Sequence, residues 1–448
     1  MNITGKKISI IGAVRSGLGA AKLAKKLGAK PFVSDSSDKE KLSDAVMVLE
    51  SENIEYEIGL HSEKVYECDF IITSPGVPSN SAVLTNALNK GIKIISELEF
   101  ASWFCNGKIL AITGTNGKTT TTSLCAYTLN KAGYKCYEAG NIGLAFSEIV
   151  LNIKEDEYVA LETSSFQLDY VDSFSPFISV ILNITPDHLD RYENSVAKYA
   201  ASKLNIAKNQ NIYQYYVCNF NDSEIPALSN EAVNKFHFSL TENLANGAFI
   251  KNGRFMFSNN YVVEDVCSLE TLSIKGSHNQ QNALAVLAIA KIVGCSNESI
   301  ADAFTKFPGV EHRLEFVREL NGIEYINDSK ATNVDSVWYA LQSFDKPIYL
   351  ILGGKDKGND YNRIKELVIK HVLKIFAIGS SADKINDFFN AVVPVEIKKD
   401  LRDCVLSAHK EAQPNTILLL SPACASFDMF ENYEHRGKVF KEEIMKMK

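Results

Sequence analysis

The sequence predicts an α/β protein of three domains, each built on a parallel sheet. The chain has 448 residues, and a typical domain has roughly 150. Short apolar, β-branched runs alternate with helical stretches along most of its length, which is the pattern of parallel strands connected by helices. Glycine-rich loops follow several of these runs, at the strand ends where such sheets bind ligands.

The first domain, residues 1–97, is predicted to be Rossmann-like. Its predicted elements are a strand at Lys7–Ile11, a glycine-rich turn at Gly12–Gly19, a helix at Ala20–Leu27, and strands at Lys30–Ser34, Asp69–Thr73 and Gly91–Ile95. The turn glycines depart from the G-x-G-x-x-G spacing of dinucleotide-binding loops. Three alternatives therefore stay open: a dinucleotide, a pyrophosphate or uridine phosphate at the helix N-terminus, or close packing of the helix on the strand.

The central domain, residues 98–309, is predicted to be a parallel sheet of the P-loop ATPase type. Its predicted strands are Ile109–Ile112, Tyr158–Leu161 and Ile178–Ile184, and its predicted helices are Thr119–Ala132 and Ala283–Ile292. Residues 213–272 differ in character, because Ala248–Lys251 and Arg254–Phe257 flank Asn252-Gly253, a strong hairpin signature. We expect an antiparallel β extension at the edge of this sheet.

The third domain, residues 310–448, is again predicted to be Rossmann-like. Three strands, Ile348–Leu352, Ile375–Ile378 and Ile417–Leu420, each run into a loop of small residues and then a helix. Because parallel strands end at the same edge of a sheet, the three loops are expected to meet there.

Composition and charge exclude several classes of protein. Apolar residues make up 46% and charged residues 23% of the chain, as in ordinary globular proteins. The 47 basic and 54 acidic residues give a net charge of −7, so no global basic field attracts nucleic acid. The apolar run Ala283–Ala290 is shorter than the ~18 residues of a membrane helix, and the nine cysteines show no C-x-x-C spacing. We expect a cytoplasmic monomer with no nucleic-acid or membrane partner.

The stretch Thr113-Gly-Thr-Asn-Gly-Lys-Thr-Thr120 carries the strongest functional pattern. It follows a strand and opens a helix, so its backbone N–H groups and the helix N-terminus can surround phosphate oxygens. Lys118 can reach the β- and γ-phosphates of a nucleoside triphosphate, and the Thr119 hydroxyl can bind Mg²⁺. The stretch lacks the first glycine of G-x-x-x-x-G-K-[ST], so a tight turn is the alternative. We expect a nucleoside triphosphate to bind Gly114, Thr115, Asn116, Gly117, Lys118, Thr119 and Thr120.

Further motifs follow the phosphate loop in order. They are Gly140-Asn-Ile-Gly143, Glu162-Thr-Ser-Ser-Phe-Gln-Leu168, Asp187-His-Leu-Asp-Arg-Tyr192, His278-Asn-x-x-Asn282, His312-Arg313 and Asp328-Ser-Lys-Ala-Thr-Asn333. This series resembles the Mur ligases, which are ATP-dependent amide-forming enzymes of peptidoglycan precursor synthesis. Leu352-Gly-Gly-Lys-Asp-Lys-Gly358 and Ser421-Pro-Ala-Cys-Ala-Ser-Phe-Asp428 resemble the branch that joins D-glutamate to UDP-N-acetylmuramoyl-L-alanine.

The resemblance implies a reaction and a ligand for each of the three domains. ATP phosphorylates the substrate carboxylate, the amino acid attacks the resulting acyl phosphate, and ADP and phosphate are released. Residues 1–97 would bind the uridine nucleotide substrate, residues 98–309 ATP, and residues 310–448 the amino acid. Lys118, His188 and Lys203 would serve the reaction itself.

Two Mg²⁺ sites are implied as well. Thr119 and Glu162 would hold one ion, and His188 with a carbamylated Lys203 would hold the other. Each of these residues also has a simpler interpretation: Glu162 as a helix cap, His188 as a histidine in a turn, and Lys203 as one of several lysines on a solvated helix face. Only the resemblance selects Lys203.

By the same resemblance, four residues would bind the adenine, ribose and phosphates of ATP: Asn279, Asn282, Arg313 and Asp328. Asn279 and Asn282 are three positions apart and so share one helical face, although a capping and a surface asparagine would fit the pattern too. Arg313 follows the linker Phe307-Pro308-Gly309, and a structural linker arginine is the alternative.

The resemblance also implies two sets of substrate-binding residues. The uridine nucleotide would bind Ser16, Asp35, Ser36, Asn141, Ser164 and His188, and D-glutamate would bind Lys330, Thr332, Lys357, Ser426, Phe427 and Tyr433. Lys357 would bind the side-chain carboxylate. However, Lys355-Asp356 stands where the family often has an acidic residue and glycine, and a solvated charged turn is the alternative.

Other functions stay open. A sister Mur ligase would add L-alanine or a diamino acid, but the third domain lacks the acid-and-arginine motif expected for a diamino acid. A folylpolyglutamate synthase-like ligase would lack the N-terminal Rossmann-like domain. A nucleotide-switched binding protein would need the phosphate loop but not Glu162, His188 and Lys203 together.

Overall fold

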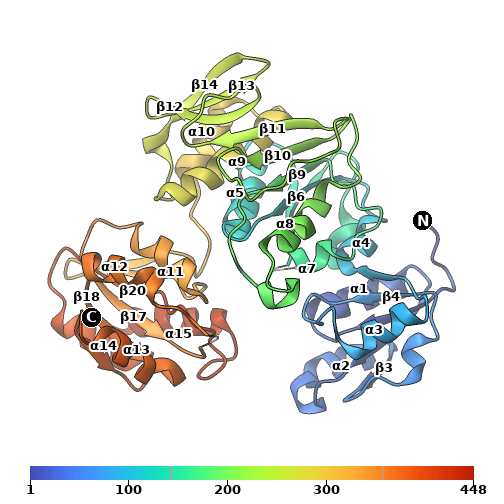
Figure 1. Cartoon of the computed structure of the whole chain (residues 1–448), viewed down its shortest axis with the longest axis horizontal. Helices are drawn as coiled ribbons and strands as arrows, with labels where there is room; N and C mark the ends of the chain where they lie inside the picture. The colour runs from blue at the N-terminus through green and yellow to red at the C-terminus, as the bar shows by residue number, and fades with distance from the viewer. Residues whose placement is uncertain (142–143, 357, 448) are drawn as a thin grey trace. The chain divides into compact units, whose positions relative to one another are not determined.

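The structure is a computed structural model that describes residues 1–141, 144–356 and 358–447 (Figure 1). Its strands form three sheets, each dominated by parallel pairs, so the predicted α/β fold is confirmed. The chain divides into two compact units, Met1–Leu272 with Gln280–Phe307, and Ser273–Asn279 with Pro308–Lys448. The first two sheets belong to the first unit and the third sheet to the second. The domain boundaries at residues 97 and 309 stay predictions.

The first sheet has five parallel strands in the order β3-β2-β1-β4-β5. The strands are β1 (Lys7–Ile11), β2 (Lys30–Asp35), β3 (Glu55–Ile58), β4 (Phe70–Thr73) and β5 (Ile94–Ser96), and the helices are α1 (Arg15–Lys26), α2 (Ser43–Ser51) and α3 (Ala82–Asn89). Strand β1 lies in the middle, and its apolar side chains are buried. The sequence does not predict β3, because two of its four residues are glutamates.

The glycines of the first loop mainly serve packing. Helix α1 begins at Arg15 and not at Ala20, so Gly17 and Gly19 are helical, and Gly12, with φ +99°, lies in the turn. A Cβ on Gly17 would lie 1.8 Å from the carbonyl oxygen of Gly12, and one on Gly19 would lie 2.5 Å from Ser147 Oγ. The predicted turn is therefore wrong in its extent, and close helix packing explains these two glycines.

The second sheet has nine strands in the order β14-β13-β12-β11-β10-β9-β6-β8-β7. They are β6 (Lys108–Thr113), β7 (Cys136–Gly140), β8 (Tyr158–Glu162), β9 (Ile178–Ile181), β10 (Tyr215–Asn219), β11 (Asn234–Ser239), β12 (Gly247–Lys251), β13 (Arg254–Asn259) and β14 (Val262–Ser268). The predicted hairpin is confirmed, with Lys251 opposite Arg254. The antiparallel extension is shorter than predicted, because β10, β11 and β12 pair in parallel and the antiparallel pairs are β12 with β13 and β13 with β14.

Helices accompany this second sheet. They are α4 (Glu97–Ser102), α5 (Lys118–Lys131), α6 (Phe146–Ile149), α7 (Ser165–Leu168), α8 (Val196–Leu204), α9 (Ser277–Val293) and α10 (Asn297–Lys306). Residues Ala283–Ala290 of α9 are completely buried, which confirms a buried helix there.

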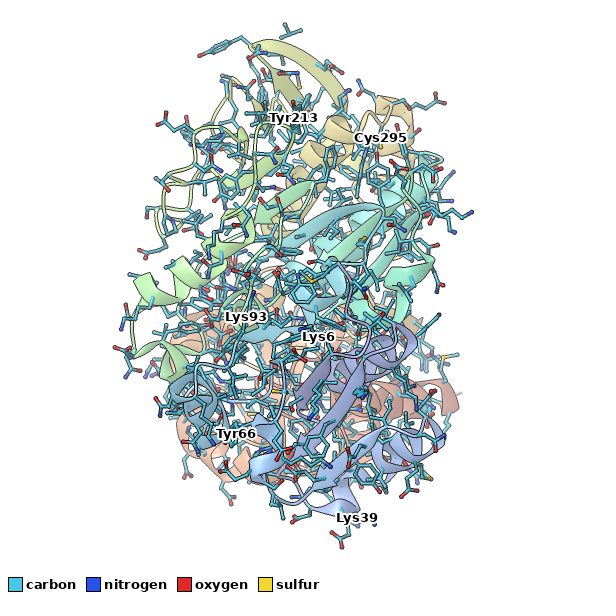
Figure 2. The ribbon with its side chains drawn as sticks, turned by 90° about the vertical axis from the view of Figure 1, so that its right-hand side faces the viewer. Lys6, Lys39, Tyr66, Lys93, Tyr213 and Cys295 are labelled. Atoms are coloured by element: carbon cyan, nitrogen blue, oxygen red, sulfur yellow. The ribbon has the colours of Figure 1, made fainter. Side chains whose placement is uncertain are left out.

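Helix α4 connects the first sheet to the second inside the first unit. The buried carboxylate of Glu99 accepts hydrogen bonds from the backbone N–H groups of Asp172, Ser173 and Phe174 at 3.0, 2.9 and 2.8 Å. Nearby, Lys93 (labelled in Figure 2) forms an exposed ion pair with Asp172, a type of contact that contributes little to stability. The hydrogen bonds to Glu99 therefore contribute more than this ion pair to holding residues 172–174 in place.

The third sheet has six strands in the order β15-β16-β20-β17-β18-β19. The strands are β15 (Glu315–Leu320), β16 (Ile323–Asn327), β17 (Ile348–Gly353), β18 (Val372–Ile378), β19 (Val395–Ile397) and β20 (Thr416–Leu420), and the helices are α11 (Val334–Leu341), α12 (Asn362–His371), α13 (Ala382–Phe389), α14 (Leu401–Glu411) and α15 (Tyr433–Lys446). Along β17, Leu350 and Leu352 pack in one core with α11, α12 and α13, whereas Tyr349 and Ile351 pack in another with α14 and α15. The sheet is therefore covered on both faces. Across all the described residues, no helix is long and apolar enough to span a membrane.

Candidate active site

The phosphate loop lies at the carboxyl end of β6, between Thr113 and the start of α5 at Lys118. Gly117 has φ +86°, and a Cβ there would lie 2.3 Å from Asn282 Oδ1, so only glycine fits against α9. Lys118 Nζ donates hydrogen bonds to the carbonyl oxygens of Gly114 and Thr115 at 2.8 and 2.7 Å. The hydroxyl of Thr120 is buried and has no hydrogen-bond partner among the described residues. A polar ligand at this loop would give that hydroxyl a partner.

Thr119 and Glu162 meet beside the loop. Strand β8 pairs with β6 so that Glu162 lies opposite Ile112, and its buried carboxylate accepts a 2.7 Å hydrogen bond from Thr119 Oγ1. The Asn141 amide donates to the other carboxylate oxygen at 3.4 Å. Hydroxyl and carboxylate oxygens are the ligands that Mg²⁺ prefers, so these residues fit a magnesium ion. Glu162 is not a helix cap, because Ser164 caps α7 by accepting a hydrogen bond from Gln167 N.

Lys203 is buried, so its placement on a solvated helix face is wrong. Its side chain, on the last turn of α8, is 1% exposed. Its Nζ donates to the carbonyl oxygen of Gly114 at 2.9 Å and lies 4.5 Å from the centre of the Tyr199 ring. Burial, and then the charge of Lys118, lower the pKa of Lys203 well below its usual value. The lowered pKa makes the neutral amine more accessible than it is in an exposed lysine, and the neutral amine is the form that can add CO₂.

His188 follows β9 in a turn and adopts a positive φ of +52°. Its side chain is about half exposed, with Nε2 3.7 Å from Asp187 Oδ2 and its ring 5.1 Å from that of Phe166. Burial lowers the pKa of His188, and the neighbouring Asp187 opposes this effect. A largely neutral imidazole with an accessible edge can serve as a metal ligand.

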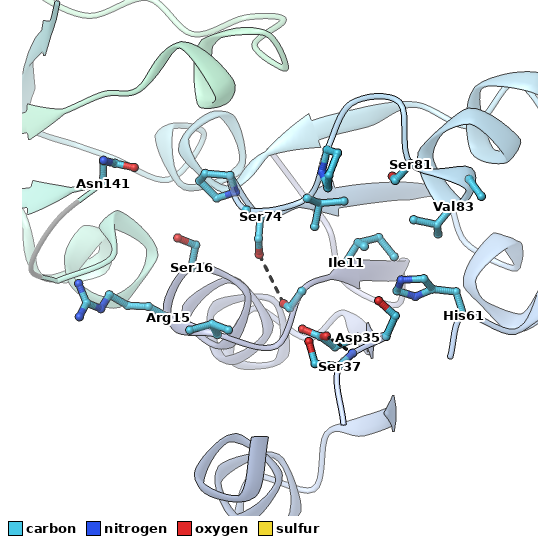
Figure 3. A pocket seen from close by; sticks show the side chains of 18 residues that line it. Ile11, Arg15, Ser16, Asp35, Ser37, His61, Ser74, Ser81, Val83 and Asn141 are labelled. Carbon is cyan, nitrogen blue, oxygen red and sulfur yellow. Dashed lines mark hydrogen bonds between the residues drawn. The ribbon is translucent and has the colours of Figure 1, made fainter. Parts of the chain in front are cut away.

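A cavity of about 750 Å³ opens at the carboxyl ends of the strands of the first sheet (Figure 3). Its lining includes the predicted residues Ser16, Asp35, Ser36 and Asn141. The Asp35 carboxylate accepts hydrogen bonds from Ala13 N and Ser37 N, both at 2.8 Å. Burial raises the pKa of Asp35, but these hydrogen bonds outweigh it and the net effect lowers the pKa. Ser164, by contrast, is not among the lining residues.

In the second unit, Asp328 directly follows β16 and is fully buried. Its carboxyl group accepts hydrogen bonds from Ser421 Oγ at 2.8 Å and Leu314 N at 3.2 Å. Burial raises the pKa of Asp328 to about 7, although these hydrogen bonds and the charge of Arg313 oppose the rise. Arg313 itself lies in a turn, with its N–H bonded to Val310 O.

The loops after β17, β18 and β20 meet at one edge of the third sheet, as predicted. Gly353 N donates to Pro422 O, Gly354 N to Ser381 Oγ and Lys355 N to Ala425 O, at 2.9, 3.2 and 2.8 Å. Several of the predicted D-glutamate ligands lie in or beside these loops: Lys330, Thr332, Ser426, Phe427 and Tyr433. Of these, Ser426 is buried, Phe427 is exposed, and Lys330 Nζ lies 5.8 Å from the Tyr433 ring centre. Lys357 lies outside the described residues.

Asn279 and Asn282 both belong to α9, as predicted. Asn282 is buried and abuts Gly117 of the phosphate loop. Asn279 is also buried, and its side-chain amide donates to Lys275 O at 2.8 Å. The preceding His278 is strongly desolvated, and this burial lowers its pKa to about 3.

Family models match most of the chain. They are the Mur ligase middle domain over residues 112–290, the Mur ligase glutamate ligase domain over residues 312–424 and the MurD N-terminal domain over residues 7–83. The UDP-N-acetylmuramoylalanine–D-glutamate ligase of Chloroherpeton thalassium is 42% identical over 465 residues, covering 99% of each chain. That of Salinibacter ruber is 41% identical and covers 98% of this chain and 97% of its own. The chain belongs to the Mur ligase family.

Solved structures of other Mur ligases share the fold. The UDP-N-acetylmuramate–alanine ligase MurC of Thermotoga maritima aligns with a TM-score of 0.62 at 19% identity, covering 99% of this chain and 100% of its own. The MurF ligase of Thermotoga maritima in complex with ADP aligns with a TM-score of 0.57 at 14% identity, covering 93% and 95%.

Two residues of this Mur ligase escape prediction from the sequence. His61 lines the cavity and contacts Ser34 Oγ through Nδ1 at 2.6 Å, but it follows β3, which the sequence does not predict. Arg436 on α15 is 1% exposed and donates to Ser329 Oγ, Ser329 O and Cys424 O at 2.9, 2.8 and 3.0 Å. It thereby ties the loop after β16 to the loop after β20. An arginine in a polar helix gives no sign of such burial.

Proposed function

We propose that the chain joins D-glutamate to UDP-N-acetylmuramoyl-L-alanine at the expense of ATP, in peptidoglycan precursor synthesis. The cluster at the phosphate loop carries the proposal: Lys118 and Lys203 at the Gly114 carbonyl, with Thr119 and Glu162 beside it. Phosphate binding alone would not need a buried carboxylate and a second, buried lysine there. The full-length similarity to D-glutamate ligases selects the substrates.

The reaction has two steps. A carboxylate oxygen of the muramoyl-alanine attacks the γ-phosphorus of ATP, the bond to the β-phosphate oxygen breaks, and ADP leaves. The amino group of D-glutamate then attacks the acyl carbon and loses a proton, and phosphate departs with the carbon–oxygen bonding pair. Two anions must approach each other in the first step, so catalysis consists mainly of positioning and charge neutralisation. Lys118 would leave the loop carbonyls and bind the phosphates.

Thr119 and Glu162 would hold one Mg²⁺, and His188 with a carbamylated Lys203 would hold the second. Bound Mg²⁺ would neutralise charge on the phosphate oxygens. The burial and lowered pKa of the Lys203 amine support carbamylation, because an amine must lose its proton before it can attack CO₂. The product is a carbamate, whose carboxylate carries a negative charge.

The remaining residues bind substrates. The uridine nucleotide would occupy the cavity lined by Ser16, Asp35, Ser36 and Asn141, whose size suits such a ligand, with Ser164 and His188 toward its carboxylate. ATP would bind Gly114–Thr120, Asn279, Asn282, Arg313 and Asp328. D-glutamate would bind Lys330, Thr332, Lys357, Ser426, Phe427 and Tyr433. Residues 1–97, 98–309 and 310–448 would thus serve the nucleotide substrate, ATP and the amino acid.

Phosphate release from ATP tests the proposal. The protein is incubated with UDP-N-acetylmuramoyl-L-alanine and Mg²⁺, and D- and L-amino acids are added one at a time. Release that depends on D-glutamate is the expected result. Release that depends on a diamino acid, or on L-alanine with the unsubstituted muramic acid nucleotide, would assign the chain to a sister ligase. ATP binding without release in any mixture would favour a nucleotide-switched binding protein.

A further inference from the structure

Arg191 connects the cavity of the first sheet to the surroundings of the phosphate loop. It lies in the short helical turn Leu189–Tyr192, three residues after His188. Its guanidinium donates to the carbonyl oxygens of Pro75 and Gly76 at 3.0 and 3.3 Å. Both of these residues line the cavity. One side chain therefore fixes two adjacent carbonyls of the cavity wall from the segment that carries His188.

The same guanidinium packs on an aromatic ring. Its central carbon lies 4.1 Å from the centre of the Phe166 ring, and Phe166 in turn contacts the His188 ring edge-on at 5.1 Å. The hollow between Pro75, Phe166 and Arg191 measures about 10 Å³, room for one water molecule at most. The contact between the guanidinium and the ring is thus close, so a shift of the Pro75-Gly76 loop would be transmitted to Phe166.

The contacts continue from Phe166 to the phosphate loop. The Phe166 ring stacks parallel to that of Tyr192 at 6.2 Å, and Tyr192 packs on Tyr199 at 5.3 Å. The Tyr199 hydroxyl lies 3.3 Å from Thr115 Oγ1 in the phosphate loop. A series of contacts therefore runs from the backbone carbonyl oxygen of Gly76 in the cavity wall, through side chains, to Thr115.

We propose that Arg191 is a positioning residue that couples binding of the uridine nucleotide in the cavity to binding of ATP at the phosphate loop. The proposal rests on the proposed function. A ligand that orders the Pro75-Gly76 loop keeps both carbonyl oxygens aligned with Arg191. The guanidinium of Arg191 then holds the Phe166 ring in place. The Phe166 ring in turn holds His188 and Tyr192, and Tyr192 holds Tyr199. Coupling between two sites is reciprocal, so ATP favours the nucleotide to the same degree. Arginine suits this position because its planar group can stack and donate two parallel hydrogen bonds, whereas lysine cannot.

The test measures the dissociation constant of UDP-N-acetylmuramoyl-L-alanine by calorimetry, with and without a saturating non-hydrolysable ATP analogue. In the unaltered protein we expect the analogue to tighten binding at least about fivefold, a common size for coupled sites. The ratio of the dissociation constant without the analogue to that with it measures the coupling. Arg191→Lys is expected to bring this ratio to within about twofold of one, with each ligand still bound. A purely structural defect would lower the folded fraction but would leave the ratio unchanged. Arg254→Lys, an exposed arginine paired with Asp265 on the β hairpin, is the matched control and should keep the full ratio.

A second variant tests the aromatic part of the series. Phe166→Leu removes the ring under the guanidinium but leaves the hydrogen bonds of Arg191 to Pro75 and Gly76 possible, and it too should reduce the ratio. The double variant should lose little more than either single one, because both changes interrupt the same contacts. If Arg191→Lys fails to fold, Phe166→Leu alone decides.

The outcomes separate the two proposals. If the unaltered protein binds neither ligand, the proposed function fails and the coupling fails with it. If both ligands bind but do not affect each other, or if both variants keep the full ratio, the coupling through Arg191 is overturned and the proposed function stands.

Discussion

Lys118 and Lys203 donate hydrogen bonds to the same atom, the carbonyl oxygen of Gly114, at 2.8 and 2.9 Å. Two ammonium groups on one acceptor would repel each other, and the charge of Lys118 is one cause of the lowered pKa of Lys203. The arrangement therefore separates the roles of two chemically identical side chains. Lys118 is the cation that would meet phosphate, whereas burial and the charge of Lys118 lower the pKa of Lys203.

Lys118→Ala should lower turnover by two to three orders of magnitude, that is, about 10²–10³-fold. The change deletes the lysine of the phosphate loop while the strand and helix around it stay intact. Loss of a major electrostatic contact costs ~3–4 kcal/mol, a fall of about 10²–10³ in rate. Steady-state phosphate release measures it. Lys131→Ala, an exposed lysine at the other end of the same helix, should keep the full rate, and a near-normal rate for Lys118→Ala would remove the ATP-site assignment.

Glu162→Gln should raise the Mg²⁺ concentration needed for activity. Glutamine has the same shape and can still accept the hydrogen bond of Thr119, but it lacks the negative charge that holds a divalent ion. We expect the required Mg²⁺ concentration to increase about tenfold or more. Even the loss of a residue that hydrogen-bonds to a metal ligand lowers metal affinity about tenfold. A titration of phosphate release against Mg²⁺ measures the change. Glu155→Gln, an exposed glutamate before β8, serves as the control, and an unchanged Mg²⁺ requirement in Glu162→Gln would contradict the metal assignment.

The sequence predicts the strands that supply the phosphate loop and the loops of the third sheet, because buried parallel strands are short apolar runs with glycine at their ends. It fails where a strand is polar or at an edge, as at Glu55–Ile58 and Val395–Ile397. It also misplaces Lys203 and misses Arg436. Each stands on a helix among other charged residues, and its burial is set by tertiary contacts with Gly114 or with Ser329 and Cys424, which no local pattern shows.

Asp328→Asn should stabilise the protein more at high pH than at low pH. Burial raises the pKa of Asp328 to about 7 from its usual 3.8. Between these values the folded protein holds a proton that the unfolded chain has released, so the stability from Asp328 falls as the pH rises. Asparagine stays neutral and can pair with Ser421 and Leu314. We expect the unfolding free energy of Asp328→Asn, relative to that of the unaltered protein, to rise by about 2–4 kcal/mol between pH 5 and pH 8.

Chemical denaturation at the two pH values measures this change. Asp345 is an exposed aspartate that precedes β17 and serves as the control. Asp345→Asn should differ from the unaltered protein in unfolding free energy by nearly the same amount at both pH values. A difference for Asp328→Asn that stays constant, or that moves toward the unaltered protein as the pH rises, would contradict a raised pKa for Asp328 in the folded protein.

Lys203→Ala should be inactive but folded. A helix-surface lysine would contribute little to stability, whereas Lys203 is buried, so the variant loses a hydrogen bond to Gly114 and gains a cavity. The loss is partly offset because a desolvated amine is removed, and Lys118 still donates to the same carbonyl oxygen. We expect a moderate drop of about 1–3 kcal/mol in unfolding free energy. Lys203→Met, of similar volume, should be equally inactive and closer to the unaltered protein in stability.

Chemical rescue distinguishes the two roles open to Lys203. If the residue acts as a carbamate, it supplies a negative charge beside His188, and formate or acetate can enter the cavity left in Lys203→Ala and supply that charge again. Partial recovery of phosphate release with these acids is therefore expected in Lys203→Ala, but not in Lys203→Met, where the side chain fills the space. If the residue acts as a cation, small amines would restore activity and carboxylates would not. Recovery with amines alone would overturn the carbamate while leaving the roles of Lys118 and Glu162 intact, because neither depends on the charge of Lys203.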